Sequence, residues 1–441
     1  MQNNANSITL TYKFLFIIPI FYVFFYLIYA FNAWFYQDDF TFLYRHIITI
    51  NWENIWNFGN FGRFVSRDLY WYSMYQFFGF NSVFYFVFNL TLLILNAFLC
   101  YLFLKQMNIN LSFSVLSGIA YFISLPALVN FYWISNSQHL LAHTFIFIFL
   151  ILITKNTFFL SSSWKNQLVA FLIFIVALYS NILSFFILPF LFFRIYLFRN
   201  SIIFSKQLGF FLIGILTVGI LFILKIKQYS TGAYRLDYSF SALINNLNFY
   251  LEPYNLNPYL FLVLVVIISV YSIIFKKENT SQLLILSMFL YAPFALASAQ
   301  QYHNYVHLST VFLIVTFLSF LNKKINKYII SILTIAILIY SGKGFINYMS
   351  NDPLGKKVKI LCETLKKNYP SEKHFIFYAS NGKDIPIVWW ATGFGDGLRL
   401  FVDPNATYEY SSNTENSSCF VKMSDHLTID EIECQKSKGL K

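Results

Sequence analysis

The chain has 441 residues, of which 58% are hydrophobic, 22% are aromatic and only 11% are charged, and its formal net charge is +12. A composition this apolar excludes an ordinary soluble globular protein and indicates a polytopic membrane protein. The basic residues fall in short clusters between hydrophobic runs and form no continuous stripe. This pattern is typical of membrane orientation signals and argues against nucleic acid as a partner.

The hydrophobic runs predict about eleven transmembrane helices, because a helix needs about 20 apolar residues to cross the hydrocarbon core of a bilayer. The first is expected to be a retained helix, since no small-residue cleavage site follows it. The predicted spans are 13–33, 82–104, 112–132, 139–154, 167–181, 183–198, 207–226, 258–275, 282–299, 307–322 and 327–345.

The orientation follows from the connections between these spans. With the N-terminus inside, the inner connections carry basic residues such as Lys105, Arg194 and Lys323, as the positive-inside bias requires. Two large loops, 34–80 and 228–257, and the tail after residue 345 then lie on the outer face. The aromatic residues of loop 34–80 predict short helices in the headgroup layer.

The tail differs in composition from the rest of the chain. Residues 354–368 followed by 374–378 predict a helix and then a buried strand. The predicted fold is therefore an all-α polytopic membrane domain over 1–345 with a small α/β-like extracytoplasmic domain over 346–441. The glycine-rich segment 393–397 is interpreted as a turn in preference to a phosphate-binding loop, because no clear strand precedes it and no clear helix follows. Three cysteines in this tail leave room for one disulfide, Cys419–Cys434, and one unpaired thiol.

The candidate catalytic residues are Asp38 and Asp39, at the outer end of the first predicted helix. Four of the seven carboxylates before residue 352 lie in loop 34–80, and these two are adjacent. Neighbouring carboxylates repel each other, which raises one pKa unless a cation, metal or proton lies between them. Adjacent side chains point in different directions, so we expect one to act in the chemistry and the other in the scaffold, with Asp38 slightly favoured for the chemistry. The chemical role could be general base, metal ligand or acceptor-orienting group.

Outer basic residues are candidates for binding a phosphate. Arg63, Arg67 and Arg235 break the positive-inside trend, which points to an anionic partner such as a lipid-linked phosphate. Contact with anionic lipid headgroups is the alternative, and it is weakest for Arg63, which directly follows Gly62.

Further outer polar residues are candidates for binding substrate: Gln138, His139, Glu252, Tyr302 and His303. His139 and His143 have the i, i+4 spacing of a metal pair, but no carboxylate stands beside them, so a hydrogen-bonded polar cluster is favoured. The sequence implies no definite cofactor or metal site and leaves a divalent cation open.

Together these features resemble the GT-C superfamily of membrane glycosyltransferases. The resemblance is carried by the uncleaved first helix, Asp38-Asp39 at the start of a long outer loop, the downstream Gly62-Arg63, about eleven spans and an outer C-terminal domain. It implies a sugar donor on a polyprenyl phosphate and an acidic residue of the first loop at the reacting centre. The chain lacks the Trp-Trp-Asp-Tyr-Gly signature of oligosaccharyltransferases, because Trp389-Trp390 is followed by Ala391 and Thr392.

The functional expectation is a glycosyltransferase that moves a single sugar from a polyprenyl-phosphate donor to an envelope glycan, lipid or protein acceptor. Its expected location is the bacterial inner membrane, with the active site on the outer face and membrane lipids around it. Two alternatives remain: a flippase or transporter of lipid-linked sugars, and an O-antigen polymerase or ligase. A transporter favours charged groups near the bilayer midplane, and polymerases or ligases need no acidic pair in the first loop.

Overall fold

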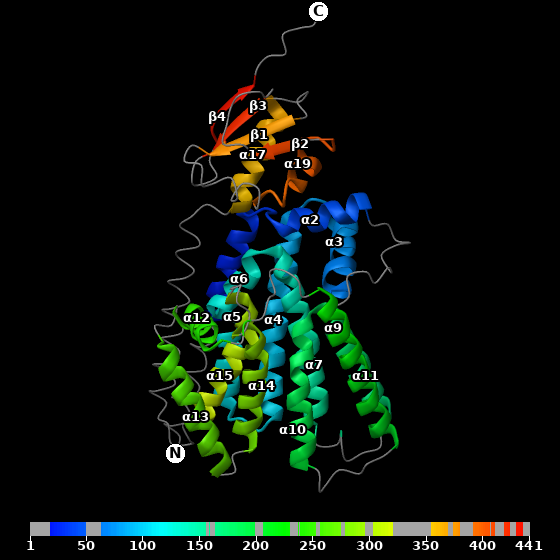
Figure 1. The fold of residues 1–441 in the computed structure, drawn as a ribbon, viewed down its shortest axis with the longest axis vertical. Helices are drawn as coiled ribbons and strands as arrows, with labels where there is room; N and C mark the ends of the chain where they lie inside the picture. Colours follow the sequence, from blue (N-terminus) through cyan, green and yellow to red (C-terminus); the bar gives the residue numbers. More distant parts are fainter. Residues whose placement is uncertain are drawn as a thin grey trace, which may run out of the picture.

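A computed structural model describes residues 18–49, 63–155, 158, 164–198, 206–229, 237, 239–252, 256–274, 278–295, 303–320, 354–368, 374–379, 391–405, 407–410, 419–423 and 429–434. The predicted span 327–345 lies outside these residues. Figure 1 shows a body of long helices at one end of the long axis and a small sheet at the other, with the short helices α2 and α3 between them.

The apolar runs form helices in every predicted span that the structure describes. The helices of the body are Ile18–Asn32, α4 (Ser82–Gln106), α5 (Leu111–Ile123), α6 (Leu125–Tyr132), α7 (Ser137–Thr154), α9 (Trp164–Ser180), α10 (Leu188–Phe198), α11 (Lys206–Tyr229), α12 (Phe240–Leu251), α13 (Pro258–Ile274), α14 (Glu278–Ala295) and α15 (His307–Phe320). Three short 3-10 segments connect them: η4 (Ile134–Asn136), η5 (Ile182–Ile187) and η7 (His303–Val306).

Two helices among the described residues, Ser82–Gln106 and Ile134–Thr154, are long and apolar enough to cross a membrane. A third candidate is the pair α5 and α6, which bends by 42°. The predicted span 112–132 is therefore broken: Ser124 takes an extended conformation (ψ 157°), and Pro126 lies in the first turn of α6, where its missing N–H costs nothing. The other apolar helices are shorter, so the helical fold is confirmed but the full set of eleven crossings is not shown.

Buried Arg194 joins three helices of the body. Its Nε and Nη2 donate to the carbonyl oxygens of Ile153 and Thr154, at 3.0 and 2.8 Å, and so satisfy the C-terminal end of α7. Its Nη1 donates to Gln282 Oε1 on α14 at 2.8 Å. Arg194 was expected in an inner connection, but it is only 5% exposed, and it ties α10 to α7 and α14.

The described parts of the first loop, 34–49 and 63–80, contain four helical segments, in agreement with the predicted short helices. They are α2 (Asp38–Tyr44), η1 (Arg45–Thr49), η3 (Phe64–Leu69) and α3 (Tyr70–Phe78). Both η1 and η3 are π-helical turns, which the sequence did not predict. Such turns are rare and occur often at functional sites, which makes this loop a reasonable place to look for one.

The described residues of the tail form a four-stranded sheet and two helices. Its elements are α17 (Leu354–Asn368), β1 (His374–Ala379), α19 (Asp396–Phe401), β2 (Thr407–Tyr410), β3 (Cys419–Met423) and β4 (Ile429–Cys434). The strand order is β2-β1-β3-β4, with β1 parallel to both neighbours and β4 antiparallel to β3. The predicted helix and first strand are confirmed.

The tail packs directly on α2. The Gln37 N–H donates to Ala391 O at 2.8 Å, and Thr41 Oγ1 donates to Gly393 O at 3.2 Å. The ring of Phe401 on α19 packs edge-on against Trp34, with ring centroids 4.5 Å apart. Figure 1 shows α19 lying directly above α2. The glycine-rich segment is thus the predicted turn, but α19 begins within it, which the sequence did not indicate.

We predict that Gly393→Ala loosens this packing and lowers the melting temperature of the detergent-solubilised protein. Gly393 has φ of +62°, and an added Cβ would lie 2.5 Å from Gln37 O and 2.8 Å from Phe40 Cβ. The left-handed conformation alone costs an alanine about 1–2 kcal/mol. Gly209→Ala is the matched control, because nothing lies within 4 Å of an added Cβ in α11. Equal melting temperatures for the two variants would contradict the packing argument.

Candidate active site

Asp39 is a buried carboxylate that connects α2 to the segment before α7. It is fully buried. Its Oδ1 accepts hydrogen bonds from the Ser135 backbone N at 2.8 Å and Ser135 Oγ at 2.5 Å, and its Oδ2 accepts from the Tyr36 N at 3.2 Å. Burial raises the pKa of Asp39 to about 8, although these three donors oppose the shift. Asp39 therefore has the scaffold role that we expected of one member of the pair.

Asp38, its neighbour, is half-buried at the start of the same helix. Burial also raises the pKa of Asp38, and the positive charge of Arg63 acts in the opposite direction. A carboxylate with a raised pKa is a stronger base than an ordinary aspartate, and a nearby cation keeps part of it ionised. Asp38 and Arg63 thus form the charged part of the candidate site, and both were predicted to belong to it.

His139 lies close to this pair. It is buried near the start of α7, and Arg63 also interacts electrostatically with it. Its Nδ1 is 3.3 Å from Asn181 Nδ2, and its ring lies against Tyr305, with centroids 5.3 Å apart. Because the Asn181 amide donates to Nδ1, the hydrogen of the neutral ring is on Nε2. His139 is thus held by neighbours from two other parts of the chain, and the structure brings it together with Arg63 and Asp38.

Two further histidines lie deeper in the helical body. The Tyr121 hydroxyl is 2.7 Å from His143 Nδ1, and the Tyr121 ring stacks on His307 at 4.0 Å. His307 Nδ1 is 3.0 Å from Asn130 Nδ2, and its Nε2 donates to Tyr121 O at 2.8 Å. His139 and His143 therefore belong to a hydrogen-bonded polar cluster, the interpretation favoured over a metal pair.

Arg67 was predicted to bind phosphate, and in the structure it forms an ion pair. Its Nε lies 3.0 Å from Asp68 Oδ1 and its Nη2 lies 3.0 Å from Asp68 Oδ2, so the contact is bidentate. Arg45 Nη2 lies 4.0 Å from the same carboxylate. His46 Nε2 donates to Arg67 O at 3.2 Å, and burial lowers the pKa of His46 to about 4, so this ring is neutral. The arrangement gives Arg67 a structural role between η1 and η3.

The structure links the remaining predicted residues less directly to Asp38 and Arg63, or does not describe them. Gln138 is buried beside His139. Glu252 is exposed at the end of α12, which packs on α13 and α14, whereas α2 packs on α19, η1, α3 and η4. Arg235, Tyr302 and the side chain of His303 lie outside the described residues.

Two residues of the site were not predicted: Ser135, which holds Asp39, and Asn181, which holds His139. Both are polar residues in breaks between apolar runs, which is the signal that could have identified them. Ser66 was also missed; its hydroxyl donates to Ser180 O next to Asn181 and so links η3 to the end of α9.

The described residues contain no group of three His, Cys, Asp or Glu side chains that could hold a metal. Of the two adjacent aspartates, Asp39 already accepts three hydrogen bonds, which leaves Asp38 as the carboxylate more open to a cation. The divalent cation left open by the sequence stays an expectation.

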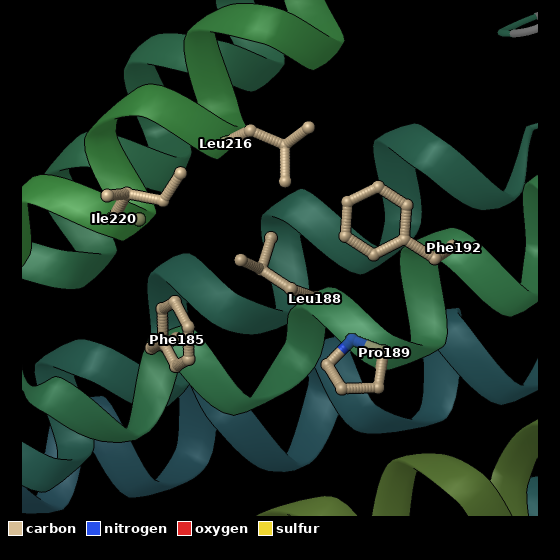
Figure 2. A pocket seen from close by; sticks show the side chains of 7 residues that line it. Phe185, Leu188, Pro189, Phe192, Leu216 and Ile220 are labelled. Atoms are coloured by element: carbon tan, nitrogen blue, oxygen red, sulfur yellow. The ribbon is translucent and has the colours of Figure 1, made fainter. Parts of the chain in front are cut away.

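An apolar cavity of about 280 Å³ lies between η5, α10 and α11, away from these polar residues. Its lining consists of carbon side chains and one glycine: Phe185, Leu188, Pro189, Phe192, Leu216, Gly219 and Ile220. Figure 2 shows the side chains of Leu188, Phe192 and Leu216 turned toward the space between the two helices. Such a lining suits a hydrocarbon chain and offers no group for chemistry.

No protein-family model matches the sequence, and comparison with curated proteins finds no match either. The functional argument therefore depends on the geometry of the site itself.

We predict that the stability of the protein falls as pH rises from about 6.5 to 8, and that Asp39→Asn removes most of this dependence; below about 6.5 the lowered pKa of His46, about 4, gives an opposing dependence. The folded-state pKa of Asp39, about 8, lies above its unfolded value of about 3.8. Its protonation thus stabilises the folded state fully below pH 4, and this contribution is lost as pH rises through 8. The expected slope for one proton is about 1.4 kcal/mol per pH unit. The measurement is the melting temperature in detergent across this range, and an unchanged slope in the variant would contradict the assignment.

Proposed function

We propose that this protein is a membrane glycosyltransferase that moves a single sugar from a polyprenyl-phosphate donor to an envelope glycan, lipid or protein acceptor. The observation that carries the proposal is that the two adjacent aspartates have different partners. The Asp39 carboxyl group already accepts three hydrogen bonds, while Asp38 is half-buried and feels the positive charge of Arg63. A base beside a cation is what transfer of a sugar from a phosphate requires.

In the proposed reaction, the acceptor hydroxyl attacks the anomeric carbon of the donor sugar. Its proton passes to the Asp38 carboxylate, and the bond between the anomeric carbon and the phosphate oxygen breaks. The phosphate leaves with the electron pair, and Arg63 stabilises its charge. His139 carries its ring hydrogen on Nε2, which suits it to donate a hydrogen bond to a sugar or phosphate oxygen. Asp39 transfers no proton in these steps, and its role is to hold α2 in place.

The membrane setting is part of the proposal. It includes about eleven crossings, an outer position for the site and for residues 346–441, and a bacterial inner membrane. Exposed apolar side chains support contact with lipid; on α13, for example, these are Leu260, Val263, Val266, Ile267, Val270 and Ile274. The apolar cavity between α10 and α11 supports a ligand that carries a hydrocarbon chain.

A flippase or transporter is the second candidate, and an O-antigen polymerase or ligase the third. The charged side chains of the candidate site, Asp38 and Arg63, lie in the first loop, and Arg63 also acts electrostatically on His139 at the start of α7. A transporter would place such groups along a path through the bundle. The transferase explains the acidic pair, which a polymerase or ligase does not need.

We predict that Asp38→Asn abolishes sugar transfer while the protein still inserts and folds, because the amide cannot accept the acceptor proton. The expected loss is at least about 100-fold, the usual contribution of a general base. The measurement is mass comparison of envelope glycans from cells that carry the wild type, the variant or no copy of this chain.

Asp403→Asn is the matched control. Asp403 is an aspartate of the tail whose carboxylate accepts a hydrogen bond from the Asn405 N at 2.7 Å, so the exchange should leave transfer intact. Full transfer by Asp38→Asn would end the proposed mechanism. A glycan profile that is the same with and without the wild-type chain would end the proposed function.

We predict opposite behaviour for the two loop arginines. Arg63→Ala should lower transfer with a small effect on folding, because its charge acts on the reacting groups. Arg67→Ala should lose folded protein, because it leaves the buried Asp68 without its bidentate partner, a loss that typically costs about 3–5 kcal/mol. Folded yield by size-exclusion chromatography and transfer per folded molecule separate the two effects. If Arg67→Ala is well folded and only inactive, the assigned roles are wrong.

A further inference from the structure

The four cysteines of the chain fall into two groups, two in helices and two in neighbouring strands of the tail. Cys100 on α4 and Cys362 on α17 are free and buried. Burial raises the pKa of Cys362 to about 12, so this thiol has little of the reactive thiolate form. The other two, Cys419 and Cys434, begin β3 and end β4 in the tail.

The backbone register brings these last two cysteines opposite each other. In the antiparallel pair of β3 and β4, Cys419 is the direct partner of Cys434, and the pairing continues through Val421 and Ile432. Directly opposed residues in such a ladder have Cα atoms about 4.5 or 5.5 Å apart, depending on the hydrogen-bonding pattern. Both spacings fall within the range of about 4.4–6.8 Å that disulfides need.

We propose that Cys419 and Cys434 form a disulfide that closes the β3–β4 hairpin. The proposal shares with the proposed function the outer placement of residues 346–441, and it does not depend on the reaction. Among the strands that the structure describes, β4 is the last of the sheet and pairs with β3 alone, so it gains most from a covalent link to β3.

The bond would form by thiol–disulfide exchange with a dithiol–disulfide oxidoreductase of the outer compartment. The thiolate of one cysteine attacks the disulfide of the oxidant and releases one of its thiolates, and a mixed disulfide forms. The second cysteine then attacks the mixed disulfide and releases the oxidant as a dithiol. Two protons and two electrons leave the cysteine pair, and the oxidant takes them up.

The test uses the full-length protein in its native membranes. All free thiols are first blocked with N-ethylmaleimide under denaturing conditions. The sample is then reduced and labelled with a maleimide–polyethylene glycol, and the added mass is measured on a gel. The expected result is two additions per chain that appear only after reduction. Cys419→Ser and Cys434→Ser should each give none, because the remaining thiol is blocked in the first step, whereas Cys100→Ser should still give two.

Absence of reduction-dependent additions in the wild type would overturn the disulfide. A dimer on a non-reducing gel that disappears in Cys419→Ser would overturn the link within one chain. The outer location is tested separately: after mild reduction of whole spheroplasts, a membrane-impermeant maleimide should label the wild type at both cysteines. If the impermeant maleimide labels both cysteines without prior reduction, the disulfide is overturned but the outer placement of the tail is supported. A wild-type chain that transfers no sugar would change neither the disulfide result nor the location result.

Discussion

The structure depends on the burial of one carboxyl group in a protein that is otherwise poor in ionisable groups. The side chain of Asp39 has left water, and burial of a polar group without hydrogen-bonding partners would cost several kcal/mol. Its partners come from separate places in the chain: Tyr36 from the turn before α2, and Ser135 from the 3-10 turn before α7. The acid therefore fixes the distance and orientation between the first loop and the main helical body. Because Asp38 is its covalent neighbour, the position of Asp38 is fixed as well.

The tail adds a second constraint on the same helix. Backbone contacts from Ala391 and Gly393 meet α2 at Gln37 and Thr41, and the aromatic ring of Phe401 packs on Trp34 and Phe80. Gln37 itself has φ of +56° and ψ of −129°, an unusual conformation for a residue with a side chain. Such a conformation persists only where its surroundings determine it, and here it is held by the tail on one side and α2 on the other. α2 is thus held between the helical body and the tail, and these contacts fix the position of the acidic pair.

The sequence predicted local features well and long-range contacts poorly, for a physical reason. Long apolar runs have few alternatives to helix, so the helices of the body followed from composition and length. The helix and strand at residues 354–379 followed from their periodicity in the same way. The break at Ser124 and the π-helical turns η1 and η3 depend on small local costs that a hydropathy pattern does not register. The contacts of Asp39 with Ser135, and of Thr41 with Gly393, join residues 96 and 352 positions apart, and no local pattern encodes them.

The same distinction explains which site predictions gained support from geometry. Arg63 and Arg67 are similar in the sequence, since both are expected on the outer face, and only the preceding Gly62 distinguishes Arg63. The structure separates them further, because Asp68 lies beside Arg67 and accepts hydrogen bonds from its Nε–Nη2 edge. A guanidinium held in that way stabilises the loop, whereas Arg63 acts electrostatically on Asp38 and His139. In a chain with so few charges, the assignment of one carboxylate to one arginine decides which cation is left for the proposed chemistry.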